Sequence, residues 1–333
     1  MIFHPAILAL LFSSAFICFM VLYAATCGIQ ILRRWDLRSG SELQLSLERK
    51  TYLVSSMLCY AFGFQLISLF LFVYTVDRIY PFFVGAMCAA GSLYANAYGY
   101  PVLLFKVMNF LLAGFWLLLN YTDNRASDYP LIRKRYGLLL ALAVLIPVES
   151  VLQANYFARL APNIITSCCG SLFSGDAADG SSDITALPAA IMKIVFFVVM
   201  AFTLGSGLVY SLKRKGGYLF SALSALCFIV SILSILSFIS PYVYELPTHH
   251  CPFCLLQKEY GHIGYPLYLA LFGATILGTG VGILMPFVKI ASLAQTIPSI
   301  QKRIGLAAVV LFSLFLILVA WKMIFTDFIL DVQ

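Results

Sequence analysis

The chain alternates between long apolar runs and short polar segments along its whole length. A transmembrane helix needs about 20 consecutive apolar residues, whereas membrane strands alternate polar and apolar positions. The runs here are continuously apolar, so they predict an all-α, polytopic membrane bundle of about eight transmembrane helices, without a sizeable soluble domain. We expect the spans near residues 6–32, 51–76, 100–120, 138–158, 188–212, 218–239, 266–287 and 304–326.

Composition agrees with this pattern. Hydrophobic residues make up 62% of the 333 residues and charged residues only 11%, where a soluble protein has about a quarter charged residues. Residues Met1 to His4 lead directly into the first run, without a basic segment or a small-residue cleavage site. We therefore expect a retained helix and not a removed signal peptide.

The basic residues predict the orientation of the bundle. Of the 21 basic residues, 15 lie in alternate connecting segments, near 33–50, 125–135, 213–215 and 289–303. By the positive-inside rule these segments face the cytoplasm. Both termini and the loops 77–99, 159–187 and 240–265 then face outside, which in a bacterium is the periplasmic side of the inner membrane. The net charge of +7 is thus explained by basic loops that set the topology and contact lipid headgroups. It does not indicate nucleic-acid binding.

A short motif occurs twice. Gly99-Tyr100-Pro101 and Gly264-Tyr265-Pro266 each follow an outside loop with cysteine and precede an apolar run. Proline suits the first position of a helix. Four spans separate the copies, which is consistent with a parallel 4+4 repeat of four-helix halves at 1–160 and 188–333, joined by a flexible 159–187 loop. The alternative is that Gly-Tyr-Pro is a common sequence at helix starts and that the two copies are unrelated.

Cysteine and histidine concentrate in the outside segments. Five of the nine cysteines and all four histidines fall there. The densest segment holds Cys251-Pro252-Phe253-Cys254 after two histidines. We expect a helix to start at this motif, with Cys251 near the N-cap and Pro252 first in the helix, so that the helix dipole lowers the pKa of Cys251. The alternative is a static disulfide that staples the loop.

The other outside cysteines are Cys88, which follows Met87, and the adjacent pair Cys168-Cys169. A disulfide within the pair would be strained and easily reduced. Alternatively, each sulfur of the pair serves a different partner. Because the five outside cysteines are an odd number, we expect one, with Cys88 the natural candidate, to be a free thiol, a metal ligand or a link to another chain. The remaining cysteines, Cys18, Cys27, Cys59 and Cys227, are expected to be packing residues inside spans.

The same side chains suit a soft metal ion. Thiolates and imidazoles together favour Cu(I) or Zn(II), and His4 or Met87 are additional candidates. A covalent c-type haem is not expected, because Leu255 follows the C-x-x-C. The candidate metal ligands are His249, His250, Cys251, Cys254, His262, Cys88, Cys168 and Cys169.

The segment His250-Cys251-Pro252-Phe253-Cys254-Leu255-Leu256-Gln257-Lys258 resembles the C-P-L-C-x-x-Q-R stretch of the DsbB family of disulfide-forming membrane proteins. Vitamin K epoxide reductases share the general plan. The resemblance implies a periplasm-facing C-x-x-C beside a quinone, with a second cysteine pair in another loop. It covers about ten residues, and the chain departs from the family in Lys258 and in its eight spans. As a whole, the chain also resembles bacterial multi-span membrane proteins.

Ionisable residues inside spans are a second candidate feature. Glu149 lies in mid-span, while Lys106 and Lys193 lie about two turns from the outer surface. Charges at such depth usually face partners or cavities. We expect Glu149 and Lys106 to form a buried pair or a proton path, although either lysine can instead extend outward to the headgroups. Asn109 and Asn120 are expected to form interhelical hydrogen bonds.

Two main functions follow from the sequence. In the first, a membrane thiol–disulfide oxidoreductase uses Cys251 as the attacking thiolate and Cys254 as its resolving partner. Cys168, Cys169 and Cys88 would relay electrons from a periplasmic thioredoxin-like protein, and a membrane quinone would accept them, with Glu149 or Lys106 handling protons. In the second, the protein binds or handles copper or zinc, which it exchanges with a metal-carrying protein. A structural subunit of a membrane complex is the third alternative.

Overall fold

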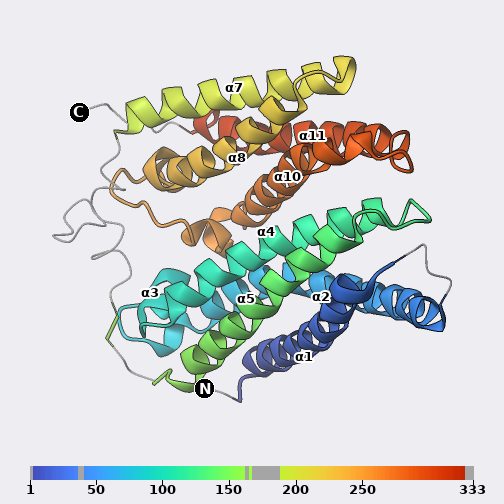
Figure 1. Ribbon diagram of the computed structural model, residues 1–333. Coiled ribbons are helices and arrows are strands. Elements are labelled where there is room, and N and C mark those ends of the chain that lie inside the picture. Colours follow the sequence, from blue (N-terminus) through green and yellow to red (C-terminus); the bar gives the residue numbers. More distant parts are fainter. Residues whose placement is uncertain (1–2, 37–40, 162–164, 167–187, 327–333) are drawn as a thin grey trace. The chain divides into compact units, whose positions relative to one another are not determined.

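The computed structural model describes residues 3–36, 41–161, 165–166 and 188–326 (Figure 1). Within these residues, eight helices are long and apolar enough to cross a membrane. This confirms the predicted all-α, multi-pass helical bundle. The helices are α1 Pro5–Arg34, α2 Glu42–Arg78, α4 Gly99–Asp123, α5 Ile132–Ala158, α7 Ala189–Lys213, α8 Gly217–Ser234, α10 Gly264–Leu284 and α11 Thr296–Ile324.

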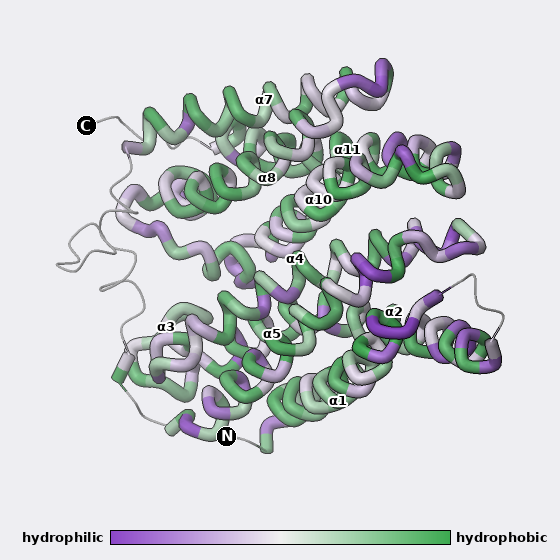
Figure 2. Tube along the Cα trace, in the orientation of Figure 1, coloured by the Kyte–Doolittle hydropathy of each residue, from purple (hydrophilic) through white to green (hydrophobic). Residues whose placement is uncertain are grey.

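Hydropathy follows these helices. Figure 2 shows hydrophobic residues along most of each long helix, with hydrophilic residues mainly near the helix ends and in the connections. Many large apolar side chains are exposed on the helices, among them Phe12, Phe19, Tyr60 and Leu104. Exposed apolar surface on this scale is expected of a protein that contacts lipid.

The two Gly-Tyr-Pro motifs start helices, but at the glycine and not at the proline. Helices α4 and α10 begin at Gly99 and Gly264, so each proline occupies the third helical position, where its missing N–H is still unneeded. A Cβ atom at Gly99 would collide with the carbonyl of Leu93, and one at Gly264 would lie 2.9 Å from the carbonyl carbon of Leu255. The glycines therefore permit close backbone approach at both helix starts.

The chain divides into two compact units. Unit 1 comprises residues 1–78, 93–164 and 289–296, with the long helices α1, α2, α4 and α5; unit 2 comprises residues 79–92, 165–288 and 297–333, with α7, α8, α10 and α11. The segment 79–92 belongs to unit 2 although it lies in the first half of the sequence. A parallel repeat between the predicted halves at 1–160 and 188–333 stays a prediction.

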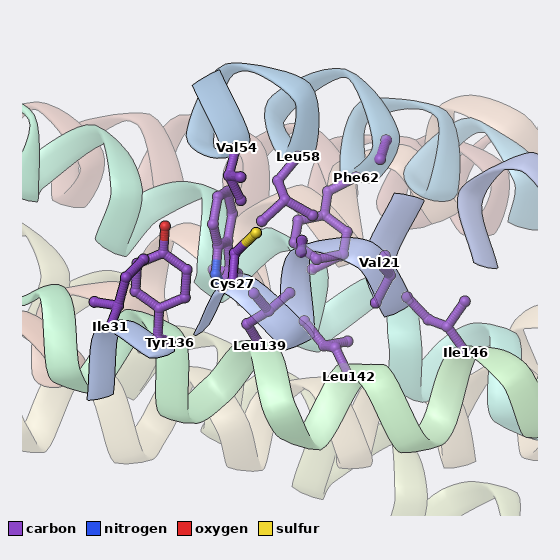
Figure 3. Packing of buried hydrophobic residues seen from close by; sticks show 14 of the residues in the cluster. Val21, Cys27, Ile31, Val54, Leu58, Phe62, Tyr136, Leu139, Leu142 and Ile146 are labelled. Atoms are coloured by element: carbon purple, nitrogen blue, oxygen red, sulfur yellow. The ribbon is translucent and has the colours of Figure 1, made fainter. Parts of the chain in front are cut away.

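Side chains from α1, α2 and α5 build the core of unit 1. Figure 3 shows Val21 of α1, Leu58 of α2 and Leu142 of α5 meeting in one apolar cluster. At its centre the ring of Phe62 meets that of Trp116, from α4, edge to face, with their centroids 4.9 Å apart. Tight apolar packing of this kind holds together helices that lipid alone would not drive to associate.

In unit 2, helices α7, α8, α10 and α11 pack around small residues. Gly207 of α7 lies so close to Phe220 of α8 and Val309 of α11 that a Cβ atom there would approach both within 2.7 Å. Gly278 of α10 similarly faces Ser224 of α8. Small residues at such contacts allow transmembrane helices to approach closely. The loop that connects α9 (Ser240–Tyr244) to α10 joins two helices of this unit.

Candidate thiol and metal site

The C-x-x-C motif lies in the α9–α10 loop and does not start an α-helix, so that expectation was wrong. The loop contains two single 3₁₀ turns, Cys254–Leu256 and Lys258–Tyr260, and Cys251 precedes both. Gln257 adopts an extended conformation that ends the first turn, and Gly261, at φ +65°, ends the second. The helix dipole therefore does not contribute to the chemistry of Cys251.

Three cysteine sulfurs converge at this loop. Cys88, Cys251 and Cys254 are buried, and their Sγ atoms all lie within 4.8 Å of one another. Cys251 and Cys254 are thiols. The Sγ atoms of Cys88 and Cys251, which are 163 positions apart in sequence, are separated by 3.5 Å. All three residues belong to unit 2.

The distance of 3.5 Å between the Sγ atoms of Cys88 and Cys251 distinguishes a disulfide from shared coordination of a metal ion. A disulfide joins its sulfurs at about 2.05 Å. Thiolates that share a tetrahedral zinc at about 2.3 Å lie about 3.8 Å apart. The observed separation is close to the second geometry, and it is also short enough for a thiol–thiolate hydrogen bond. Cys88, the candidate for the odd one among the five outside cysteines, thus lies in one cluster with the C-x-x-C motif.

Of the histidines, His249 lies nearest to the cluster. Its Nε2 is 3.3 Å from the Sγ of Cys254, and its ring meets that of Tyr244 with centroids 4.7 Å apart. The separation between Nε2 and Sγ is near that of neighbouring ligands on one zinc ion. His249 is therefore placed to act as a fourth ligand or as a proton acceptor for Cys254.

His250 has a different role, which the local helix geometry explains. Helix α8 continues into a π-helical turn, Ile235–Ile239, in which the N–H of Ser240 reaches back to the carbonyl of Ile235. If the π-helical pattern continued, the carbonyl of Leu236 would accept a hydrogen bond from the N–H of residue 241. That residue is Pro241, which has no N–H. Nδ1 of His250 donates to this carbonyl at 2.9 Å instead. His250 thus satisfies a carbonyl that the π-helical turn and Pro241 leave open within the continuous helix Gly217–Tyr244.

Within unit 2, His262 is not brought into the cluster, and the predicted role of His4 stays a prediction. Nδ1 of His262 donates to the carbonyl of Leu256 at 2.6 Å, which supports the turn before α10. His4 belongs to unit 1 and precedes α1. Cys168 and Cys169 lie outside the described residues. Just before them in sequence, the N–H of Thr166 donates to the carbonyl of Val84 at 2.8 Å.

Hydrogen bonds from flanking side chains hold the motif in place. The hydroxyl of Tyr244 donates to the carbonyl of Cys251 at 2.5 Å, and that of Tyr268 to the carbonyl of Pro252 at 2.8 Å. The amide of Gln257 donates to the carbonyl of Met87 at 2.8 Å, which ties the motif to the segment that carries Cys88. Such flanking bonds orient the groups that do the chemistry. Sequence reasoning did not assign these tyrosines or Gln257, although Gln257 lies in the motif that carries the family resemblance.

The crowding of the sulfurs changes their acidity. A hydrogen bond from the thiol of Cys254, and a second from Cys88, hold the pKa of Cys251 well below its usual range. The pKa of Cys254 is raised, because its proton is shared with the Cys251 sulfur and because it is buried. Cys251 is therefore the more acidic thiol of the C-x-x-C pair, and hydrogen bonding, not a helix dipole, is the cause.

Comparison with known proteins finds no match: no family model, curated protein or solved structure is similar to this chain. Its function is therefore argued from the chemistry of its sites.

The predicted pair of Lys106 and Glu149 is confirmed in unit 1. The ammonium of Lys106 donates to Oε1 of Glu149 at 2.7 Å and to the hydroxyl of Ser68 at 2.7 Å. The amides of Gln65 and Asn109 both donate to Oε2 of Glu149 at 2.6 Å. Both charges are buried and compensated, so Lys106 does not extend to the headgroups. Sequence reasoning did not assign Gln65 and Ser68 to this network, because they are two polar residues within an apolar run.

Lys193 is also directed inward. Its ammonium donates to the hydroxyl of Tyr242 at 2.8 Å and lies 4.7 Å from the centroid of that ring. Tyr242 lines a pocket of about 360 Å³ in unit 2, together with Tyr260, Trp321 and Phe325. The rings of Tyr260 and Tyr244 have centroids 4.4 Å apart. Because Tyr244 also meets His249 edge to face, a series of ring contacts joins the pocket to the edge of the thiol cluster.

Proposed function

We propose that this protein binds a soft metal ion, Cu(I) or Zn(II), through Cys88, Cys251 and Cys254, with His249 as the fourth ligand. The observation that carries the proposal is the convergence of three buried sulfurs within 4.8 Å. Three thiolates and one imidazole match the donors and the coordination number that zinc prefers, and three thiolates alone suit Cu(I). Buried thiolates are costly without a compensating cation, which a bound ion would provide.

The proposed role is to acquire the ion outside the cytoplasm and pass it on. The orientation is part of the proposal: the distribution of basic residues supports a bacterial inner-membrane protein with both termini and the cysteine loops in the periplasm. The partner is then a periplasmic metal-carrying protein. Reporter fusions at both termini test the orientation, and cytoplasmic signals from both would contradict it.

Metal analysis of the purified protein tests the proposal. Protein purified in detergent under reducing, anaerobic conditions is expected to contain about one copper or zinc ion per chain. Changing any one of Cys88, Cys251 and Cys254 to Ser should remove the ion, whereas Cys227→Ser, a buried cysteine of α8, should not. Absence of metal from the wild-type protein after incubation with both ions would overturn the proposal.

Thiol–disulfide exchange is the second candidate, favoured by the position of Cys251 between two other sulfurs. Cys251, which has thiolate character, lies in reach of Cys88 and next to Cys254 in the cluster. A disulfide on Cys251 can therefore be transferred from one neighbour to the other without backbone rearrangement. The sequence resemblance to the DsbB family supports the same chemistry.

In this second candidate a membrane quinone is the electron acceptor. Two thiols lose two electrons and two protons to form one disulfide, and the quinone gains both to become a quinol. The pocket at Tyr242 and Tyr260 has aromatic walls that could hold the ring, and ring contacts lead from Tyr260 through Tyr244 to His249. The donor would be a periplasmic thioredoxin-like protein, and the relay role of Cys168 and Cys169 stays a prediction.

Trapping separates the two candidates. Exchange predicts that the Cys254→Ala protein accumulates a mixed disulfide between Cys251 and its partner, and that the reduced wild-type protein reduces a soluble quinone. Metal binding predicts a stoichiometric ion and no quinone reduction. If neither result is found, the loops act as structure in a larger membrane complex.

A further inference from the structure

Unit 1 contains a polar pocket that the proposed function does not use. It has a volume of about 300 Å³ and lies where α1 ends and α2 begins. Its polar lining comprises Gln30, Arg33 and Arg34 from α1, and Ser46 and Lys50 from α2. Residues three or four positions apart share one face of a helix. The two helix ends therefore turn polar faces toward one pocket.

The pocket is strongly cationic. Arg33, Arg34 and Lys50 all line it, and its described lining contains no carboxylate. Among the described residues, none of these three side chains forms an ion pair or a hydrogen bond. The nearby carboxylate of Glu48 instead accepts a hydrogen bond from the amide of Gln44 at 3.0 Å. Three converging cations repel one another, and an anion between them would relieve that repulsion.

The rest of the lining is apolar. Ile29, Leu43 and Leu47 complete the pocket, and the first two are 41% and 45% exposed. A pocket for a small inorganic anion does not need aliphatic walls. Cations beside aliphatic side chains, at the end of two membrane-spanning helices, match an amphiphile that has an anionic head and acyl chains.

The two walls are held together independently of any ligand. The backbone N–H of Asp36 donates to the side-chain oxygen of Gln44 at 3.3 Å, and the N–H of Gln44 donates to the hydroxyl of Ser41 at 3.3 Å. Trp35 is buried directly after α1. The two helix ends that carry the three cations are therefore positioned by the fold of unit 1.

From these observations we infer that the pocket binds one acidic phospholipid, with the phosphate held by Arg33, Arg34 and Lys50 and an acyl chain lying along Ile29, on the span side of Arg33. Arginine pairs bind phosphate oxygens in a directed, two-point manner. Free phosphate shares the headgroup chemistry but gains nothing from the aliphatic walls. The site lies in unit 1 and does not depend on the thiol cluster.

Lipid binding to the full-length protein in detergent tests this inference. Delipidated protein is mixed with phosphatidylglycerol, phosphatidylcholine or inorganic phosphate, and bound lipid is counted by native mass spectrometry. The wild-type protein is expected to retain one phosphatidylglycerol, at least about tenfold more tightly than phosphatidylcholine. The variant R33Q/R34Q/K50Q should lose this preference.

A matched control carries the same change in net charge. Arg49, Arg133 and Lys134 are exposed residues of unit 1 outside the pocket, so R49Q/R133Q/K134Q should bind the lipid within about twofold of wild type. The charge-preserving variant R33K/R34K/K50R should retain the preference and shows that the pocket still folds. Equal loss in both charge-neutralised variants, or displacement of the lipid by phosphate at equal affinity, would overturn the inference.

Discussion

The molecule has two buried clusters of chemically active side chains, and they are built on opposite principles. Around Glu149 in unit 1, each charged atom has short hydrogen bonds to Lys106, Gln65 or Asn109, at 2.6–2.7 Å. Around Cys251 in unit 2, three sulfurs crowd together, with 3.5 Å between Cys88 and Cys251. In the first cluster both oxygens of Glu149 accept short hydrogen bonds from neighbouring helices, whereas the second cluster gathers soft sulfur ligands.

This difference separates structure from chemistry. A hydrogen-bonded polar network in a membrane holds helices together, here α2, α4 and α5. Within the described residues, Oδ1 of Asn109 is a buried acceptor of this network that has no hydrogen-bond partner. Thiols contribute little to packing that a small apolar residue would not. Under the proposed function, their convergence from distant parts of the sequence serves a bound metal ion or thiol–disulfide exchange. The expected role of Glu149 and Lys106 in proton transfer stays a prediction, and their ion pair at 2.7 Å favours a structural role.

The largest expected effect is on metal affinity, and it tests whether the thiol cluster alone binds metal. Cys251→Ser should lower metal affinity by about three orders of magnitude, because it removes one of four ligands, and should leave the fold intact. Competition with a chromogenic chelator measures this. Cys27→Ser, in the apolar core of unit 1, is the control and should retain full affinity. Equal loss in both variants would mean that the cysteines act only through folding.

The next effect concerns stability. Glu149→Leu leaves the ammonium of Lys106 buried without its counter-charge, so the free energy of unfolding should fall by about 3–5 kcal/mol. Denaturant titration in detergent micelles measures this. Metal content per folded chain should not change.

The double variant Lys106→Met with Glu149→Leu is the critical control. It removes both charges, so stability should return to within about 1–2 kcal/mol of wild type. If stability recovers but quinone reduction or metal transfer is lost, the pair takes part in function and the proposed division between the clusters fails.

A smaller effect is expected at His249. His249→Asn should weaken metal binding by about 10–100-fold, because water can replace a single imidazole while three thiolates remain. His262→Asn is the matched control, since asparagine tolerates the positive φ of 55° at that position, and it should bind metal normally. The same loss in both variants would show that the loop, and not the ligand, is affected.

The smallest effect concerns the tie between the two cysteine segments. Gln257→Ala removes the hydrogen bond to the carbonyl of Met87, which is worth about 1 kcal/mol. Metal affinity should fall by less than about tenfold, since Cys88 is held less firmly. Tyr268→Phe loses a comparable bond to Pro252 and gives an independent measure. A loss as large as that of Cys251→Ser would make Gln257 part of the site itself.

Much of the fold was predictable because a membrane imposes a simple rule on the sequence. Eight apolar runs became eight long helices, and the pairing of Glu149 with Lys106 followed from the cost of leaving either charge alone in lipid. The start of a helix at Cys251 was predicted wrongly. A proline and a cysteine are permissive at a helix start, but Gln257 and Gly261 turn the chain within a few residues.

The sequence by itself determined the helical bundle, the clustering of cysteine and histidine in a few loops, and the need for buried charges to pair. Each of these depends on the transfer of side chains between water and lipid, which composition and order already specify. Only the tertiary structure decided that Cys88 joins Cys251 and Cys254, that His249 lies beside them and that His250 and His262 cap backbone carbonyls. Those assignments depend on contacts between distant segments and on local backbone geometry, which a hydrophobic pattern does not encode.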